Sequence, residues 1–101
     1  MSRFAMFAKV IAKPGQRDNV LQSLLEASQK PMPGCEMYVV HTVPSEPETV
    51  CVYEVWKSQA DHDASLQMDS VRTIVARTRP LVERFENVRL EAVGGKGLSD
   101  K

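Results

Sequence analysis

The stretch CEMYVVHTVPSEPETVCVYEVW, residues 35–56, contains two runs rich in β-branched and aromatic residues, at Cys35–Val43 and Thr49–Trp56. Between them, Pro44 to Glu48 form a short segment that contains two prolines and a serine. Loops of this length and composition join neighbouring antiparallel strands. The stretch therefore predicts a β-hairpin, with Val43 paired to Thr49.

Alternation along the predicted hairpin divides its side chains into two sets, because successive side chains of a strand point to opposite faces. One face would carry Tyr38, Glu54 and Trp56 together with three valines. The other face would carry Cys35, Met37, Val39, His41, Cys51, Tyr53 and Val55. Both faces would therefore be largely apolar.

Before the hairpin, the apolar run Phe4–Ala12 predicts a strand that ends where Lys13-Pro14-Gly15 provides a turn. From Gln16 to Pro31 the apolar residues recur at the spacing of one helical face, which predicts a helix. These residues are Val20, Leu21, Leu24 and Leu25.

After the hairpin, a short helix is expected beyond Ser58, and a longer one from Asp69 to Phe85. Pro80 predicts a break or kink in the longer helix, because proline lacks the N–H that a helix interior uses. Val88–Val93 predicts a last strand, before a glycine-rich tail at residues 94–101. The longer helix is expected from the spacing of Val71, Ile74, Val75, Leu81, Val82 and Phe85.

The predicted order β-α-β-β-α-β is typical of an α+β, ferredoxin-like fold, in which an antiparallel sheet carries its helices on one face. Residues 1–93 would form this single domain. The first strand, like the hairpin, is apolar on both faces, and helices can cover only one of them. Because a second copy of the sheet would bury the other face, we expect a homodimer whose sheets pack face to face.

Composition excludes several classes of partner. The 101 residues include 13 basic and 13 acidic ones, with neither sign gathered into a run, which disfavours nucleic acid or an anionic membrane as a partner. The apolar N-terminal run contains Lys9 and is too short for a membrane span or a signal segment. Cys35 and Cys51 fit a reducing compartment and lack metal-ligand spacing. We therefore expect a cytoplasmic protein without a metal site.

Four short pieces of the sequence, in their order and spacing, resemble the antibiotic biosynthesis monooxygenase (ABM) family. They are Lys13-Pro14-Gly15, Pro33-Gly34-Cys35, Tyr53-Glu54-Val55-Trp56 and Arg79-Pro80-Leu81. The resemblance runs from about residue 4 to residue 93 and implies a ferredoxin-like dimer, the dimeric α/β barrel. The activities that it implies include cofactor-independent oxidation of quinols and aromatic polyketides, and haem degradation.

Two departures from the family pattern bear on the chemistry. The family commonly has two histidines after its Tyr-Glu-x-Trp, and Ser65 and Ser70 occupy those positions here, while His62 lies one helical turn before Ser65. Haem-degrading members resemble one another in an asparagine on the first strand, and Phe4–Ala12 contains none. The resemblance therefore favours chemistry without haem.

His62 is the candidate catalytic residue. Ser58 and Asp61 match the S-x-x-D pattern that caps a helix N-terminus, so a helix would begin here for structural reasons alone. His62 then lies on the side that Leu66 turns toward the core, and a histidine can exchange a proton near neutral pH. The alternative is a partly buried histidine that makes one structural hydrogen bond.

Five further residues are candidates for binding a flat substrate. Trp56, Tyr53 and Tyr38 combine an aromatic surface with a polar donor. Glu54 interrupts an otherwise apolar strand and needs a donor there, and His41 is the second histidine, in the middle of the hairpin. For each of the five, the alternative is ordinary packing in the core or an interface.

These residues favour an oxygenase that needs no cofactor. No nucleotide, flavin or haem motif occurs, so the substrate would supply the electrons itself. We expect a monooxygenase that oxidises an aromatic diol or quinol-like molecule with O₂. The alternatives are a non-catalytic dimeric module that binds a small apolar or aromatic metabolite, and an isomerase or degradation enzyme for a small carbonyl metabolite.

Overall fold

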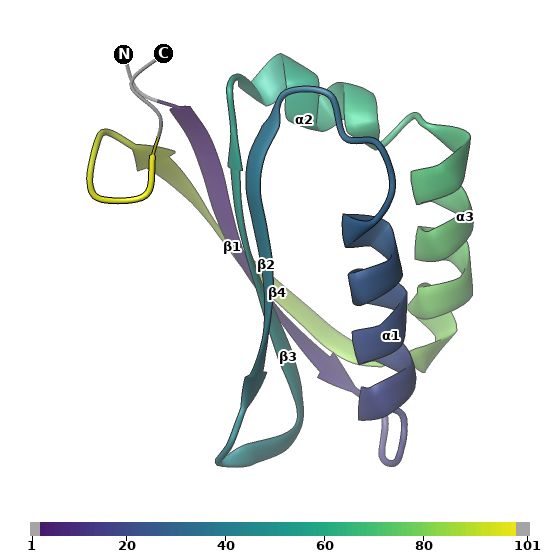
Figure 1. Ribbon diagram of the computed structural model, residues 1–101. Helices are drawn as coiled ribbons and strands as arrows, with labels where there is room; N and C mark the ends of the chain where they lie inside the picture. Colours follow the sequence, from purple (N-terminus) through teal and green to yellow (C-terminus); the bar gives the residue numbers. More distant parts are fainter. Residues whose placement is uncertain (1–2, 99–101) are drawn as a thin grey trace.

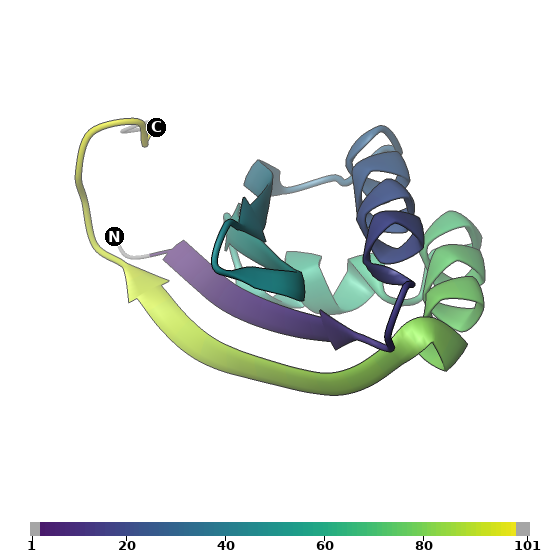
Figure 2. The ribbon, with the colours of Figure 1, turned by 90° about the horizontal axis from the view of Figure 1, so that it is seen from below.

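The computed structural model describes residues 3–98, which form a four-stranded antiparallel sheet in the order β2-β3-β1-β4. Helices α1 and α3 lie side by side against one face of the sheet, with α2 at one end of it (Figures 1 and 2). The α+β, ferredoxin-like fold is therefore confirmed. The elements are β1 (Arg3–Ala12), α1 (Arg17–Ser28), β2 (Cys35–Val43), β3 (Glu46–Trp56), α2 (Gln59–Ser65), α3 (Asp69–Thr78), the 3₁₀ turn η1 (Arg79–Leu81) and β4 (Val82–Ala92).

The hairpin of β2 and β3 has the predicted register over most of its length, with His41 opposite Cys51 and Thr42 opposite Val50. Its loop is shorter than predicted, because β3 already begins at Glu46, which pairs with Val43. A register shift after Thr42 accommodates the extra residues. The pairing of β3 with β1 ends at Thr49. Pro47, which has no backbone N–H, therefore lies outside this pairing.

A second register shift lies between Cys35 and Met37, and it makes the predicted face of Cys35 wrong. Cys35 pairs with Trp56, whereas Met37 pairs with Val55. Because directly opposite residues share a face, Cys35 lies on the face of Trp56 and not on that of Met37.

The segment after α3 differs most from the prediction. The helix ends at Thr78, and β4 begins at Val82, so the prediction of a helix as far as Phe85 is wrong. Pro80 ends the helical hydrogen bonding, and the backbone N–H of Lys13 donates to the carbonyl of Leu81 at 2.8 Å, which joins this turn to the end of β1. Phe85 consequently pairs with Val10 in the sheet.

The core lies between the sheet and the two long helices. Val10, Ala12, Val20 and Val50 form a buried cluster within it, with exposed fractions of at most 6%. Val20 comes from the apolar stripe of α1, and the others come from β1 and β3. No helix in the described part of the chain is long and apolar enough to cross a membrane.

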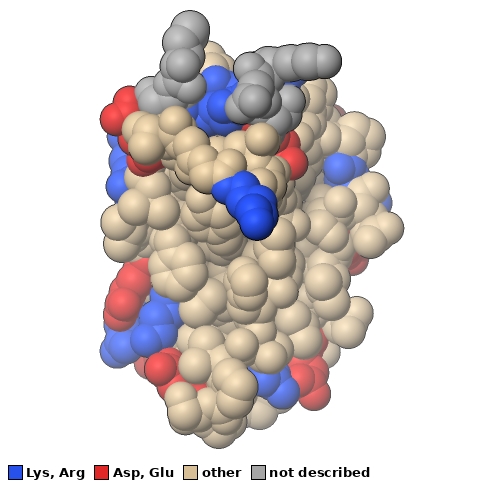
Figure 3. Space-filling model, turned by 60° about the vertical axis from the view of Figure 1, so that its left-hand side comes forward, with Lys and Arg blue, Asp and Glu red and all other residues tan. Residues whose placement is uncertain are grey.

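The opposite face of the sheet carries none of the helices formed by residues 3–98 and is rich in apolar side chains. Phe7, Val39, Val88 and Leu90 remain 38–55% exposed. Figure 3 shows uncharged side chains over the middle of this side of the molecule, with most charged side chains toward its margins. We call this surface the open face.

The end of the chain turns back along part of the open face. Residues Gly94, Lys96 and Leu98 border a hollow with Met37 and Tyr53, and Figure 1 shows the turn beside the ends of β1 and β4. Of the predicted tail at 94–101, residues 99–101 lie outside the described residues.

Candidate functional site

A cavity of about 430 Å³ lies between the sheet and the helices. This volume falls within the range of about 300–1,000 Å³ that is typical of small-molecule sites. Its wall consists mainly of apolar side chains, from Met6 on β1 to Phe85 on β4. The lining side chains with polar or titratable groups are Tyr38, Glu54, Trp56, His62, Ser65, Thr78 and Arg79.

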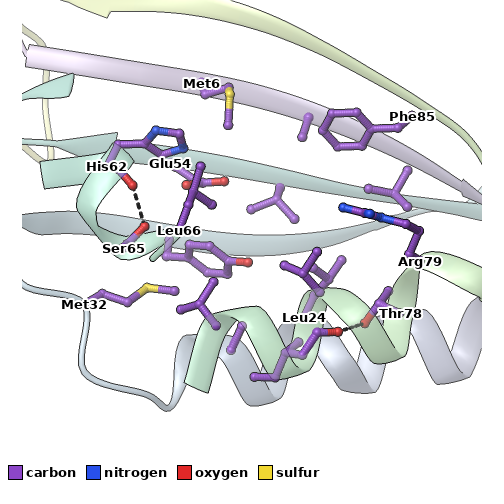
Figure 4. A pocket seen from close by; sticks show the side chains of 18 of the residues that line it. Met6, Leu24, Met32, Glu54, His62, Ser65, Leu66, Thr78, Arg79 and Phe85 are labelled. Atoms are coloured by element: carbon purple, nitrogen blue, oxygen red, sulfur yellow. Dashed lines mark hydrogen bonds between the residues drawn. The ribbon is translucent and has the colours of Figure 1, made fainter. Parts of the chain in front are cut away.

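The capped helix α2 positions His62 in this wall. The Asp61 backbone N–H donates to Ser58 Oγ at 3.1 Å, which confirms the predicted N-cap, and the Ser65 hydroxyl donates to the His62 carbonyl at 2.6 Å. A helix of two turns thus has side-chain hydrogen bonds at both ends. His62 is held at a fixed place beside the cavity, and Figure 4 shows it at the same end as Glu54 and Ser65.

The His62 ring is enclosed by aromatic groups. It is 8% exposed, with the Phe4 ring centre at 4.9 Å and the Trp56 ring centre at 5.5 Å in an edge-on arrangement. His62 Nδ1 lies 3.1 Å from Asp63 Oδ1. Among residues 3–98, Nε2 has no hydrogen-bond partner, so this nitrogen remains available to a ligand. Orientation of one ring nitrogen by a carboxylate is the arrangement that suits a histidine for proton transfer at the other.

Glu54 is the acidic group of the cavity. Burial raises the pKa of its carboxyl, and this effect is opposed by the hydrogen bond from Trp56 and by the nearby His62. The bond runs from Trp56 Nε1 to Glu54 Oε1 at 2.9 Å. Glu54 was expected to need a hydrogen-bond donor, and Trp56, on the same face of β3, provides it.

Tyr38 faces the same cavity from β2, opposite Glu54 in the register. Burial raises the pKa of its phenol well above the ordinary value, and the Glu54 charge raises it further. The phenol is therefore protonated throughout the physiological pH range and is a hydrogen-bond donor.

The structure brings four of the six candidate residues together and separates the other two. His62, Glu54, Trp56 and Tyr38 all line the cavity. Tyr53 and His41 lie on the open face, because Tyr53 pairs with Val39 and His41 pairs with Cys51. Burial raises the pKa of the Cys51 thiol, which disfavours the reactive thiolate beside His41.

Of the two serines at the positions of the common family histidines, Ser65 lines the cavity and Ser70 does not. The hydroxyl of Ser65 donates to the backbone one turn earlier, at His62. His62 therefore reaches the same cavity from a different position on the helix.

Sequence reasoning missed Arg79 and Phe85 as cavity residues. Phe85 was assigned to a helix, although an aromatic residue shortly after Pro80 is equally compatible with a strand. Arg79 lies in the turn that replaces the end of this helix, and Figure 4 shows both side chains at the opposite end of the cavity from His62. Within residues 3–98, no group of three or more His, Cys, Asp and Glu side chains could hold a metal ion.

Comparison with known proteins agrees with this arrangement. The model of the family described as antibiotic biosynthesis monooxygenase matches residues 3–77. A Chloroflexus aurantiacus protein assigned by name to the antibiotic biosynthesis monooxygenases has a similar crystal structure: 38% sequence identity, TM-score 0.90, covering 97% of this chain and 100% of that one.

More distant structures share the fold. A conserved protein from Methanosarcina mazei is 24% identical, with a TM-score of 0.76 and coverage of 91% of this chain and 94% of that one. A protein of unknown function from Nitrosomonas europaea is 21% identical, with a TM-score of 0.79 and coverage of 95% and 94%. No curated protein sequence matches at a significant level. The family model and the Chloroflexus structure together span the strands, helices and cavity described above, and the chain belongs to the antibiotic biosynthesis monooxygenase family.

Proposed function

We propose that this protein is a cofactor-independent monooxygenase that oxidises an aromatic diol or quinol-like molecule with O₂. The observation that carries the proposal is the convergence of His62, Glu54 and Tyr38 at a mostly apolar cavity. Membership of a family named for monooxygenases adds to this support. A binding module needs no such convergence, because apolar side chains alone can hold an apolar ligand.

The reaction begins with removal of a proton from a hydroxyl group of the substrate. His62 is the proposed base, because its Nε2 has no hydrogen-bond partner in the described part of the chain while Asp63 orients its Nδ1. Glu54 is a second titratable group in the same wall and is suited to a proton relay. The buried Tyr38 phenol is a donor that can stabilise the substrate oxyanion.

The resulting electron-rich anion then reduces O₂. A C–O bond forms between a ring carbon and one oxygen atom, which gives a hydroperoxide once the distal oxygen takes a proton. Loss of the ring C–H proton and cleavage of the O–O bond then release water and leave a carbonyl group. The substrate loses four electrons and gains one oxygen atom, and O₂ supplies one atom to the product and one to water. The apolar cavity wall excludes water that would otherwise solvate the anion.

Oxygen uptake with a panel of hydroquinones tests this function. We expect consumption of O₂, with His62→Gln reducing kcat by roughly a hundredfold or more, the usual contribution of a general base. His41→Gln is the matched control, because it changes the other histidine of the chain, which lies on the open face. Equal activity of the wild type and His62→Gln would remove His62 from the mechanism.

The same assay distinguishes the alternative functions. Product formation under argon would identify an isomerase or degradation enzyme acting on a small carbonyl compound. Saturable binding without turnover, in air or argon, would identify a binding module.

We further propose that two copies form a homodimer through their open faces. Support comes from Phe7, Val39, Val88 and Leu90, which are apolar, lie on one face of the sheet and are at least 38% exposed. Tyr53 and His41 would then contribute to the interface instead of the cavity. A cytoplasmic location is proposed as well, supported by Cys35 and Cys51, which are both free thiols.

A further inference from the structure

Among residues 3–98, Arg79 is the only lysine or arginine that lines the cavity. Its backbone N–H donates to the Val75 carbonyl at the end of α3, and its carbonyl accepts from the Val82 N–H at the start of β4. Between these bonds, Pro80 restricts the backbone of the turn. Figure 4 shows the side chain extending from this turn into the cavity, on the side of Phe85. The backbone from which the guanidinium extends is therefore fixed at a junction between two elements.

The guanidinium of Arg79 has no protein partner within residues 3–98, unlike those of most other arginines in the chain. Arg3, Arg17, Arg77 and Arg84 form ion pairs, and Arg89 lies over the Phe4 ring. Thr78, the neighbouring polar residue of the cavity, donates its hydroxyl to the Ile74 carbonyl at 2.7 Å. Arg79 is thus the free donor group at this end of the cavity.

The two ends of the cavity differ in charge. Glu54 and His62 lie at one end, and Arg79 lies at the other (Figure 4). A ligand with an anionic group would be repelled by the Glu54 carboxylate and attracted by the Arg79 guanidinium, across a mostly apolar wall that screens charges less than water does. This polarity would orient a long ligand with its hydroxyl toward His62.

We infer that the substrate is an aromatic diol with a carboxylate substituent, and that Arg79 binds this carboxylate at the end of the cavity away from His62. This inference rests on the proposed function for the identity of the reacting ring. The planar guanidinium suits a carboxylate, since it can form two parallel hydrogen bonds to the two oxygens. Arg79 is exposed to solvent, so the carboxylate enters last and lies at the mouth while the ring occupies the apolar interior.

Two probes that differ in charge and by one methyl group test the inference: 2,5-dihydroxyphenylacetate and its methyl ester. Binding is measured under argon, so that no turnover occurs, from the indole N–H signal in ¹H–¹⁵N spectra. The chain has one tryptophan, Trp56, and this residue lines the cavity. We expect the acid to bind roughly tenfold to a hundredfold more tightly than the ester, as a charge-assisted hydrogen bond provides.

Three variants identify the origin of this preference. Arg79→Gln should abolish it, and Arg79→Lys should retain part of it, since the charge remains but the paired hydrogen bonds are lost. Arg72→Gln is the matched control, because Arg72 is an exposed arginine on α3 that does not line the cavity. This control should keep the full preference for the acid.

Equal affinity of the wild type for acid and ester overturns the inference, and so does a preference that survives in Arg79→Gln or a cavity that takes neither probe. Oxygen uptake shows whether a failure concerns the carboxylate site at Arg79 or the proposed oxidation. If both probes are oxidised with the same kcat/KM, the inference fails and the monooxygenase proposal stands. If the acid binds selectively through Arg79 but consumes no O₂, the anion site stands and the proposed oxidation fails.

Discussion

Glu54 and Trp56, two residues apart on β3, are joined by a hydrogen bond of 2.9 Å from the indole Nε1 to the carboxylate Oε1. Successive side chains of a strand alternate between its faces, so this spacing places both groups on the cavity side. Trp56 is only 1% exposed, and its polar atom is directed to the acidic group of the cavity. The tryptophan therefore both packs in the core and supports a buried carboxylate.

A double-mutant cycle should measure this support. Trp56→Phe removes the donor and leaves the Glu54 carboxylate without a protein partner, whereas in the Glu54→Gln background the group left unpaired is neutral. We expect a coupling free energy of about 1.5–3 kcal/mol in urea unfolding, the range for hydrogen bonds to charged groups. Strictly additive effects of the two substitutions would show that the bond contributes nothing net to stability.

The stability of the protein should depend on pH through Glu54. Burial raises the pKa of this carboxyl in the folded protein above its unfolded value, so the folded state keeps its proton over a pH interval in which the unfolded chain has lost it. The stabilising contribution of the protonated form is complete below the unfolded pKa and is lost as the pH rises through the folded pKa.

The free energy of unfolding of the wild type should therefore fall relative to that of Glu54→Gln as the pH rises from about 4, by about 1.4 kcal/mol for each unit of pKa shift. Urea unfolding of both proteins at a series of pH values measures this difference. A gap between the two proteins that stays constant, or one that grows in favour of the wild type with rising pH, would contradict the assignment.

Ser58→Ala should destabilise the protein by about 1 kcal/mol, because the Asp61 N–H loses its acceptor at the start of α2. The His62 ring should also become less well positioned, so oxygen uptake should fall by more than the loss of folded protein explains. Ser58→Asp is the control, because it keeps a side-chain acceptor at the N-cap, and it should retain both properties. If Ser58→Ala is fully active when folded, the cap has no role in positioning His62.

The proposed homodimer should be sensitive to charge on the open face. Val39→Lys places an ammonium group on this face, where Val39 is 41% exposed, and should shift the protein to a monomer in light-scattering chromatography. Leu25→Lys is the matched control, because Leu25 is 39% exposed but belongs to α1, on the other side of the sheet. Equal molar masses for the two variants would argue against dimerisation through the open face.

The candidate site shows how far pattern reasoning reaches. Alternation along the hairpin already separated Tyr38, Glu54 and Trp56 from Tyr53 and His41, and the register confirms this division. Alternation could not show which of the two sets faces a cavity. Both faces are apolar, and the alternation pattern is the same whichever face the helices cover. Only the packing of α1 and α3 against one face made that distinction.

The segment after Pro80 shows where local pattern fails. Leu81, Val82 and Phe85 continue a helical spacing on paper, yet β4 begins at Val82 and pairs along the whole of β1. Backbone hydrogen bonds to β1, which is distant in the sequence, make this segment a strand. The pattern of neighbouring residues contains no information about these bonds. The chain thus brings Arg79 and Phe85 to the cavity, opposite His62.

The sequence by itself determined the order of the elements, most of the hairpin register, the cap of α2 and the apolar character of both faces of the sheet. These features depend on short-range periodicity and on the chemistry of single residues, such as the hydroxyl of Ser58. The tertiary structure alone decided which face encloses the cavity and which charged group lies across from His62. The physical reason is that both depend on contacts between segments far apart in the chain, where packing and strand pairing outweigh local propensity.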